Sequence, residues 1–350
     1  MVRAWDMLDS ITVEPSVSTL PTTGEPAATV RRRRADLAVL YEHPRWFAAI
    51  FAELERREIR FDKIFVPQHF YEVSGKEPDF KVLFNRMSPS AHSRERGSGI
   101  FYSLAYLEHL ELRGVRVING SKAFRYEVSK AAQHSLLESL GLAHLPSRVI
   151  HSVNQVEAAA EGLRYPIIVK PNVGGSGKGI VRFDSKQALG AALAAGRLSL
   201  GYDSIALIQE FVPARGGFIT RVETLGGDYL YGIRVHLSGQ TFDLCLADIC
   251  QTAGGQRLET ACTVEASKAG LKVEAYTPPP DVIDAIERIA RSAGIDVGGI
   301  EYIVDDRDGL TYYYDINALS NFVADAPRLI GFDPVEKLAD FLQEEIRRAG

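Results

Sequence analysis

A glycine-rich segment between two apolar runs most constrains the fold of this chain. Residues 166–169 (PIIV) and 180–183 (IVRF) read as short strands, so the segment from Lys170 to Ile180, KPNVGGSGKGI, forms the tip of a hairpin. Glycines at such a tip allow backbone N–H groups to approach phosphate oxygens closely. The segment therefore predicts a phosphate-binding loop, with a plain flexible hairpin as the alternative.

Spacing excludes the common phosphate loops. A P-loop requires Gly, four further residues and then Gly-Lys-Ser/Thr, but Asn172 stands at the first position and Gly179 replaces the hydroxyl residue. A dinucleotide-binding loop leads into a helix, whereas this segment leads into a strand. The protein-kinase motifs H-R-D and D-F-G do not occur in the sequence. We predict instead a lid that is mobile alone and ordered by its phosphate ligand.

Strands and helices alternate in the region before the hairpin, which favours a small parallel α/β domain. An amphipathic pattern predicts helices over 44–57 and 99–112. The expected strands of this domain are 37–41, 61–66, 80–84 and 115–119.

The rest of the chain reads as two α+β lobes. A helix over 124–140, closed by Gly141, and a strand at 148–150 precede the hairpin. Beyond it we expect helices over 281–293 and 334–348, and an irregular cysteine-bearing stretch at 243–262. The strands expected there are 205–211, 218–225, 229–235, 299–305 and 311–316. The predicted division is a flexible tail (1–35), an N-terminal α/β domain (36–120), a central lobe with the lid (121–204) and a C-terminal lobe (205–350).

Composition narrows the class of protein. The net charge of -5 argues against a general nucleic-acid binder, and no run of about 18 apolar residues is present to span a membrane. The three cysteines, Cys245, Cys250 and Cys262, form no C-x-x-C pair, which argues against zinc and favours a reducing, cytoplasmic location. Four arginines, 31–34, end the tail and read as a solvated flank or a contact for an acidic partner.

Two further stretches carry chemistry. Asp315 and Asn317 lie two apart on a predicted strand and share a face, and Glu301 on the partner strand can join them. Oxygen ligands of this kind suit magnesium, although the two residues could instead begin a loop. In ALIQEFV, from Ala206 to Val212, an apolar strand runs into a polar and then an apolar pair. It could receive an adenine ring, or be an edge strand without a ligand.

Four features of the sequence occur in the order found in the ATP-grasp superfamily, which the chain therefore resembles. They are Lys130, Lys170, the segment 209–212 and Asp315-x-Asn317. The sequence is most similar to RimK-like and glutathione-synthetase-like carboxylate–amine ligases, over about residues 36–348. The resemblance implies an α+β ATP-grasp fold behind a small N-terminal domain. It also implies an ATP-dependent ligase that forms an amide through an acyl phosphate and releases ADP and phosphate.

The resemblance also implies roles for individual residues. ATP phosphates would be held by Lys130 and Lys170, with the lid formed by Gly174, Gly175, Ser176, Gly177, Lys178 and Gly179. Adenine would be received by Gln209, Glu210, Phe211 and Val212, and magnesium (or manganese) by Glu301, Asp315 and Asn317. The catalytic arginines would be Arg221 and Arg234, and the candidate substrate-binding residues are Arg86, Arg257, Ser320 and Asn321.

The sequence departs from these ligases at two places. Ile219 stands where they often carry an acidic residue, and 248–257 does not follow their substrate-loop pattern, which points to a different acceptor. The expected partners are a small-molecule or peptide carboxylate and an amine, and the chain is expected to form a homodimer or tetramer. Two alternatives stay open: a small-molecule kinase on the same fold, and a non-catalytic nucleotide-binding regulator.

Overall fold

The computed structural model describes residues 35–43, 45–75, 78–175, 179–237 and 272–350. The predicted tail, apart from its last residue, lies outside these ranges. So do the lid tip (Ser176, Gly177 and Lys178), the cysteine stretch and Arg257.

Residues 37–118 contain the expected parallel sheet. Its strands are β1 (Leu37–Tyr41), β2 (Phe61–Phe65), β3 (Val82–Arg86) and β4 (Arg116–Ile118), in the order β2-β1-β3-β4. Every pairing is parallel, which confirms the predicted α/β domain. The third strand begins at Val82, two residues later than expected, and ends at Arg86.

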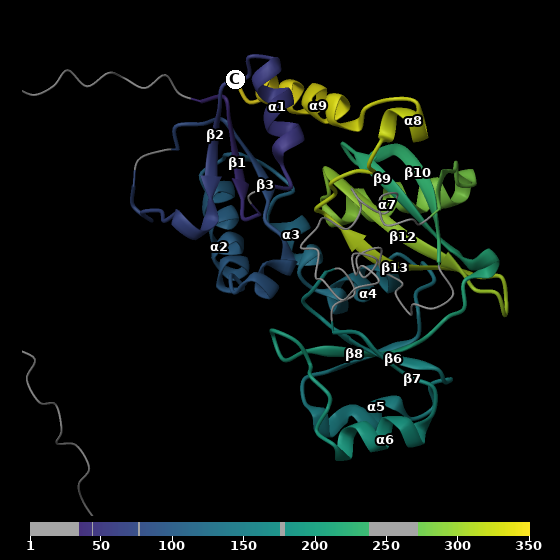
Figure 1. The fold of residues 1–350 in the computed structure, drawn as a ribbon. Coiled ribbons are helices and arrows are strands. Elements are labelled where there is room, and N and C mark those ends of the chain that lie inside the picture. The colour runs from purple at the N-terminus through teal and green to yellow at the C-terminus, as the bar shows by residue number, and fades with distance from the viewer. Residues whose placement is uncertain (1–34, 44, 76–77, 176–178, 238–271) are drawn as a thin grey trace, which may run out of the picture. The chain divides into compact units, whose positions relative to one another are not determined.

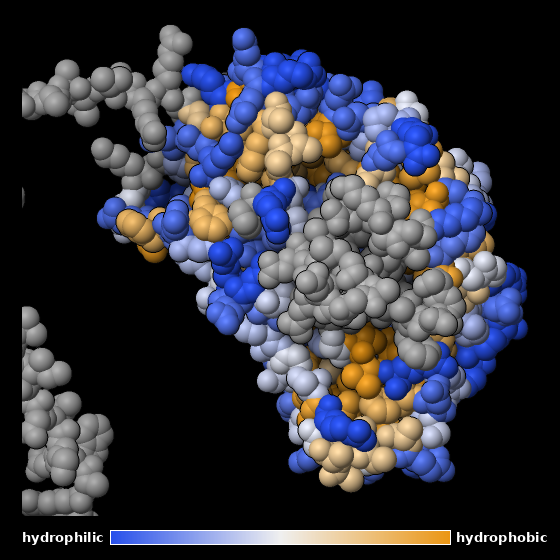
Figure 2. Space-filling view, in the orientation of Figure 1, coloured by the Kyte–Doolittle hydropathy of each residue, from blue (hydrophilic) through white to orange (hydrophobic). Residues whose placement is uncertain are grey.

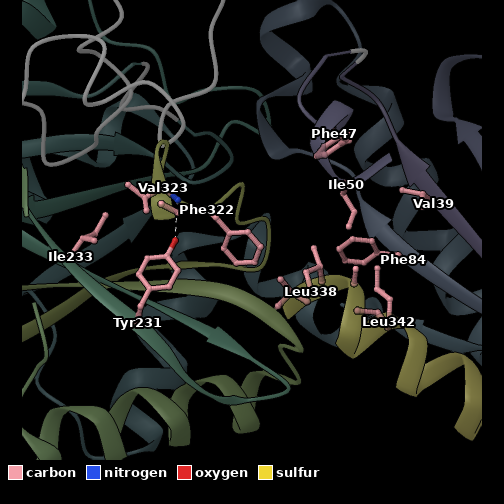
Figure 3. Close-up of a cluster of buried hydrophobic side chains, with 14 of the residues drawn as sticks. Val39, Phe47, Ile50, Phe84, Tyr231, Ile233, Phe322, Val323, Leu338 and Leu342 are labelled. Atoms are coloured by element: carbon pink, nitrogen blue, oxygen red, sulfur yellow. Dashed lines mark hydrogen bonds between the residues drawn. The ribbon is translucent and has the colours of Figure 1, made fainter. Parts of the chain in front are cut away.

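Helices cover both faces of this sheet. Alternate residues of β1 point to opposite sides: Val39 packs toward α1 (Ala48–Arg56), while Leu40 packs toward α2 (Ser98–Leu112). The C-terminal helix α9 (Pro334–Arg348) joins α1 on the first face (Figure 1). Leu338 and Leu342 of α9 lie against Ile50 and Phe84 (Figure 3), so the end of the chain completes the core of its N-terminal sheet.

The glycine-rich segment belongs to a second sheet, which is antiparallel. Its strands are β5 (Ser147–Ile150), β8 (Ala206–Glu210), β6 (Ile167–Pro171) and β7 (Val181–Phe183), in that order. The segment joins β6 to its neighbour β7, as the hairpin prediction requires. The helices α5 (Val156–Ala160) and α6 (Lys186–Ala194) pack on one face of the sheet (Figure 1).

The third sheet has five strands. They are β11 (Val273–Ala275), β10 (Asp228–His236), β9 (Phe218–Leu225), β12 (Val297–Val304) and β13 (Thr311–Asn317), in that order. The helix α7 (Pro280–Ala293) packs on one face, together with α3 (Ser121–Glu127) and α4 (Lys130–Ser139). The remaining short helices are η1 (Val66–Gln68), η2 (Pro89–Arg94), η3 (Val153–Gln155), η4 (Arg215–Gly217) and α8 (Ala326–Ile330).

Three local expectations differ from the structure. The helix expected over 124–140 is two helices, because Ser129 adopts an extended conformation and its side chain accepts a hydrogen bond from the Ala132 amide at 3.2 Å, which starts α4 anew. The strand 206–210, expected in the C-terminal lobe, pairs with β5 and β6 instead. Helices α3 and α4, expected in the central lobe, pack with α7 on the third sheet.

Within the described residues, no helix is both long and apolar enough to cross a membrane. Hydrophilic residues cover much of the visible face, with hydrophobic ones in smaller groups between them (Figure 2).

The packing of α9 yields a stability prediction. Leu342 is fully buried, and Leu342→Ala leaves a cavity that should lower the free energy of unfolding by about 2–5 kcal/mol. Arg347→Ala, on the exposed side of the same helix, is the matched control and should change it by less than about 0.5 kcal/mol. Urea unfolding followed by circular dichroism measures both, and equal effects would show that α9 does not hold this core.

Candidate functional site

Two neighbouring rows of residues, mostly charged or polar, cross one face of the third sheet. Residues paired across neighbouring strands point to the same side. Asp315, Glu301 and Arg221 are paired in this way across β13, β12 and β9. The next row contains Asn317, Gly299 and Glu223. The sheet therefore brings the three predicted metal ligands and Arg221 together.

Asp315 lies beside two lysines from other elements. Lys130, the first residue of α4, donates a hydrogen bond from Nζ to Asp315 Oδ1. Lys170, on β6, places Nζ 5.9 Å from the centre of the Tyr314 ring. Burial alone would raise the pKa of Asp315, but the charges of Lys130 and then Lys170 outweigh it and lower that pKa to about 2. The predicted phosphate-binding lysines thus meet the predicted metal site.

Glu301 is held from two sides. Its carboxylate accepts hydrogen bonds from Arg221 Nη1 at 2.9 Å and from the Tyr314 hydroxyl at 2.8 Å. The register between β12 and β13 shifts after Glu301, and this bulge places Tyr314 where its hydroxyl reaches the carboxylate. Burial, reinforced by the charge of Asp315, raises the pKa of Glu301 although Arg221 and Tyr314 lower it.

The donor set fits magnesium better than a softer metal. Among the described residues, no three His, Cys, Asp or Glu side chains gather as a metal site. The carboxylates of Glu301 and Asp315 can instead be joined by the amide of Asn317, whose Nδ2 lies 3.3 Å from Asp315 Oδ2. Two carboxylates and one amide leave further positions to water and phosphate oxygens, which is the coordination that magnesium prefers.

Arg221 is fixed between two acids. Its Nε donates to Glu223 at 2.6 Å and its Nη1 to Glu301, and all three side chains are almost fully buried. The guanidinium lies over Gly299, where a Cβ would be 2.5 Å from Nη2. Burial lowers the pKa of Arg221, but the two carboxylates raise it more. These contacts fix Arg221 beside Glu301, and its catalytic role stays a prediction.

Arg234 does not join this group. It pairs with Thr220 rather than with Arg221, so it points to the opposite face of the sheet. Its guanidinium carbon lies 3.6 Å from the centre of the Tyr276 ring and 4.3 Å from that of Phe218. The two predicted catalytic arginines are therefore separated by the sheet itself.

Of the predicted adenine-binding residues, Gln209 and Glu210 end β8, and Phe211 and Val212 follow it. Glu210 accepts a hydrogen bond from the Arg164 amide at 2.9 Å, and the Phe211 amide donates to Pro166 at 2.9 Å. Val212 is buried in the core. The side chain of Gln209 is buried, and its Oε1 has no hydrogen-bond partner in the described part of the chain.

The first described end of the lid, Gly174 and Gly175, approaches the N-terminal domain. Cβ atoms added to Gly174 and Gly175 would lie 3.9 Å from His92 and 3.7 Å from Ser90, both in η2. Gly179 has a φ of +82°, and a Cβ there would lie 2.9 Å from Pro171. Only glycine meets both conditions at that position without strain.

Three of the four predicted substrate-binding residues meet. Arg86, the last residue of β3, donates from Nη2 to Ser320 O at 2.5 Å and to Asn321 Oδ1 at 2.8 Å. Its Nε and Nη1 are buried and lack acceptors among the described residues. Burial lowers the pKa of Arg86 to about 9, although the charges of Glu127 and Glu223 raise it.

Sequence reasoning missed a buried acid beside this group. Glu127, the last residue of α3, accepts a hydrogen bond from the backbone N–H of Ala318, the residue that follows Asn317. Burial raises the pKa of Glu127 to about 7, although the bond from Ala318 lowers it. Its position three residues before Lys130, about one turn along the predicted helix over 124–140, was the available signal. The expected continuous helix hid the break between them.

Comparison with known proteins adds relatives at the level of sequence. No protein-family model matches the chain. It is 31% identical over 248 residues to the formate-dependent phosphoribosylglycinamide formyltransferase of Cupriavidus necator, a match that covers 67% of this chain and 54% of that protein. It is 26% identical over 213 residues to a probable alpha-L-glutamate ligase of Thioalkalivibrio sulfidiphilus, covering 57% and 70% respectively. The chain thus spans about half the length of the first of these relatives.

A solved structure matches most of the backbone. The ATP-grasp ligase PsnB, complexed with a phosphomimetic variant of its minimal precursor, Mg and ADP, gives a TM-score of 0.62 at 16% identity. The match covers 89% of this chain and 99% of that one. This likeness confirms the fold that the sequence motifs predicted.

The space over Gly299 yields a second prediction. Gly299→Ala forces the Arg221 guanidinium away from Glu301, and overpacking of this kind should lower the free energy of unfolding by about 1–3 kcal/mol. Gly190→Ala, in α6, meets no atom within 4 Å and should instead raise it by about 0.5–1 kcal/mol, because glycine disfavours a helix. Chemical denaturation measures the free energy of unfolding of both variants. Changes of the same sign would contradict the packing described here.

Glu127 yields a prediction on pH. Its pKa of about 7 in the folded chain exceeds the 4.5 of the unfolded chain, so folding takes up a proton between these values. The stabilisation is complete below about pH 4.5 and is lost as the pH rises through 7, a change of the order of 3 kcal/mol. Glu127→Gln should remove this loss. As the pH rises from 5 to 8, the free energy of unfolding of the wild type should therefore fall relative to that of the variant.

Urea midpoints across that range measure the effect. Glu336→Gln, on an exposed part of α9, is the control and should track the wild type. Parallel curves for wild type and Glu127→Gln would contradict the assignment.

Proposed function

We propose that this chain, whose fold is that of the ATP-grasp superfamily, is an ATP-dependent ligase that joins a carboxylate to an amine through an acyl phosphate. The observation that supports this most strongly is the meeting of Lys130, Lys170 and Asp315 beside Glu301. Two cations and two carboxylates at one place can hold a polyphosphate together with its magnesium ion. The donor set also admits manganese, which prefers similar oxygen ligands.

The first step transfers the γ-phosphoryl group of ATP to the substrate carboxylate. This step depends on positioning and charge neutralisation more than on covalent help from the protein. Lys130 and Lys170 bind the phosphates from two sides, and Arg221 holds the Glu301 carboxyl group in position. Magnesium, which Glu301, Asp315 and Asn317 would hold, would offset the negative charge of the phosphates.

The second step is attack by the amine on the acyl phosphate. The nitrogen lone pair forms the C–N bond, the phosphate leaves with the C–O bonding pair, and the ammonium proton passes to solvent or a nearby carboxylate. Water must be kept out, since it would hydrolyse the acyl phosphate, and a closing lid over 174–179 serves that purpose. Arg86, with two buried N–H groups that lack acceptors in the described structure, supplies a binding group for a substrate carboxylate.

The names of two similar proteins support the proposed ligase reaction. One is a probable alpha-L-glutamate ligase, and PsnB was solved with Mg and ADP. We propose ATP and magnesium for this chain as well, with a small-molecule or peptide carboxylate and an amine as substrates. A cytoplasmic homo-oligomer that does not bind nucleic acid remains the expectation from sequence.

A phosphate-release screen tests the proposed reaction. Purified protein is incubated with ATP, Mg²⁺ and pairs drawn from the amino acids and small carboxylic acids. A ligase releases phosphate only when both an acid and an amine are present, and hydroxylamine replaces the amine by trapping the acyl phosphate as a hydroxamate. A stable phosphorylated product from a single substrate would support a kinase instead.

Asp315 carries the corresponding mutational prediction. Asp315→Asn removes a charge that pairs with Lys130 and a candidate magnesium ligand, and should lower ADP formation more than about a hundredfold. Asp306→Asn, in the turn between β12 and β13 of the same sheet, is the control and should retain activity. Circular dichroism establishes that both variants fold, and unchanged turnover of a folded Asp315→Asn would refute the metal assignment.

A further inference from the structure

A chain of hydrogen bonds fixes the side chain of Gln209. Ser147 has one hydroxyl hydrogen, and its Oγ donates to Leu145 O at 2.7 Å. The same Oγ lies 2.8 Å from Gln209 Nε2, and with its hydrogen already used it can only accept there. Gln209 therefore presents its amide nitrogen, rather than its oxygen, to Ser147.

The second hydrogen of that amide fixes His134. Gln209 Nε2 lies 3.0 Å from His134 Nε2, which must then be the unprotonated acceptor of a neutral ring. The ring proton is on Nδ1, 3.3 Å from His144 Nδ1, and His144 Nε2 lies 3.0 Å from Glu138 Oε2. Since His144 Nδ1 accepts from His134, the proton of the His144 ring is on Nε2, toward Glu138, and Nδ1 donates nothing to Leu145 O, 3.3 Å away.

The charges around His134 agree with this assignment. Burial first, then the charge of Lys170, lowers the pKa of His134 to about 3, and Lys130 and His144 act in the same direction. The ring is therefore neutral at physiological pH. Both hydrogens of the Gln209 amide are therefore bound. Its carbonyl oxygen Oε1 can still accept a hydrogen bond, since it is buried without a partner in the described structure.

Gln209 and His134 each share a face with a phosphate-binding lysine. On α4, His134 lies one turn beyond Lys130, so the two side chains project together. In the second sheet, Gln209 pairs with Ile168, two residues from Lys170, and both side chains lie opposite the core under α5 and α6. Strand spacings place the Cα atoms of Gln209 and Lys170 about 8 Å apart. At that separation one side chain can contact the base of a nucleotide while the other contacts its phosphates.

We propose that His134 is a positioning residue that, with Ser147, orients the amide of Gln209 so that Oε1 accepts a hydrogen bond from the exocyclic amine of adenine. The protein then binds adenine nucleotides in preference to 6-oxopurine nucleotides. This inference rests on the proposed function, because it takes the nucleotide to lie between these residues. A 6-oxopurine presents a second oxygen to Oε1, and two buried acceptors facing each other without a donor are unfavourable.

Nucleotide binding to the full chain tests the inference without knowledge of the acid or the amine. Isothermal titration with ADP and with IDP, in the presence of Mg²⁺, should give a Kd for IDP at least about tenfold above that for ADP, the ratio that one buried hydrogen bond supports. His134→Leu frees the amide to rotate, and the ratio should fall to about threefold or less. Ser147→Ala removes the other acceptor and should narrow the ratio in the same direction.

Matched variants separate positioning from general damage. His134→Gln can still accept from Gln209 and should restore part of the preference, while Gln209→Leu should abolish it. Ser135→Ala, on the exposed side of the same helix, should leave the ratio unchanged. A wild-type ratio in folded His134→Leu, or equal binding of ADP and IDP by wild type, would overturn the inference. Failure of both nucleotides to bind would contradict the proposed function itself, and the inference with it.

Discussion

The charge balance around Asp315 is the constraint on which the rest of the site depends. A buried carboxylate without a counter-charge is prohibitively unfavourable, so the fold must supply cations where β13 carries this residue. It does so from two directions, with Lys130 at the start of α4 and Lys170 on β6. These elements belong to different packing units, one on the third sheet and one in the second. The site therefore exists only when both units are folded and in place, which ties binding to the architecture of the whole described region.

Buried carboxylates on the neighbouring strands β9 and β12 also require a counter-charge. Arg221 forms ion pairs with both Glu223 and Glu301, and it lies flat only because residue 299 has no side chain. Buried ion pairs of this kind contribute little net stability, because desolvation offsets most of their attraction. Their value here is geometric, since they keep Glu301 pointed along the row that Asp315 occupies. Glycine at 299 is thus as much a part of the site as the charged residues.

Local patterns in the sequence predicted what depends on neighbouring residues along the chain. Strand and helix alternation gave the parallel N-terminal sheet, glycine spacing gave the hairpin between β6 and β7, and the two-residue period placed Asp315 with Asn317. These local patterns do not determine contacts between distant segments. The pairing of β8 with β5 and β6, and the opposite orientation of Arg221 and Arg234, depend on sheet register that one strand does not encode. The break between α3 and α4 depends on a single serine cap within an otherwise helical pattern.

The position of α9 has a consequence for synthesis of the protein. Val39 and Phe84 belong to strands made early, yet their cover on one face includes Leu338 and Leu342, which are made near the end. At about 5–20 residues per second, the ribosome needs on the order of ten seconds or more to supply that helix. During this interval the N-terminal sheet presents an apolar face that a chaperone can bind and that a neighbouring nascent chain can stick to. The early part of this chain therefore depends on its last helix to become fully native.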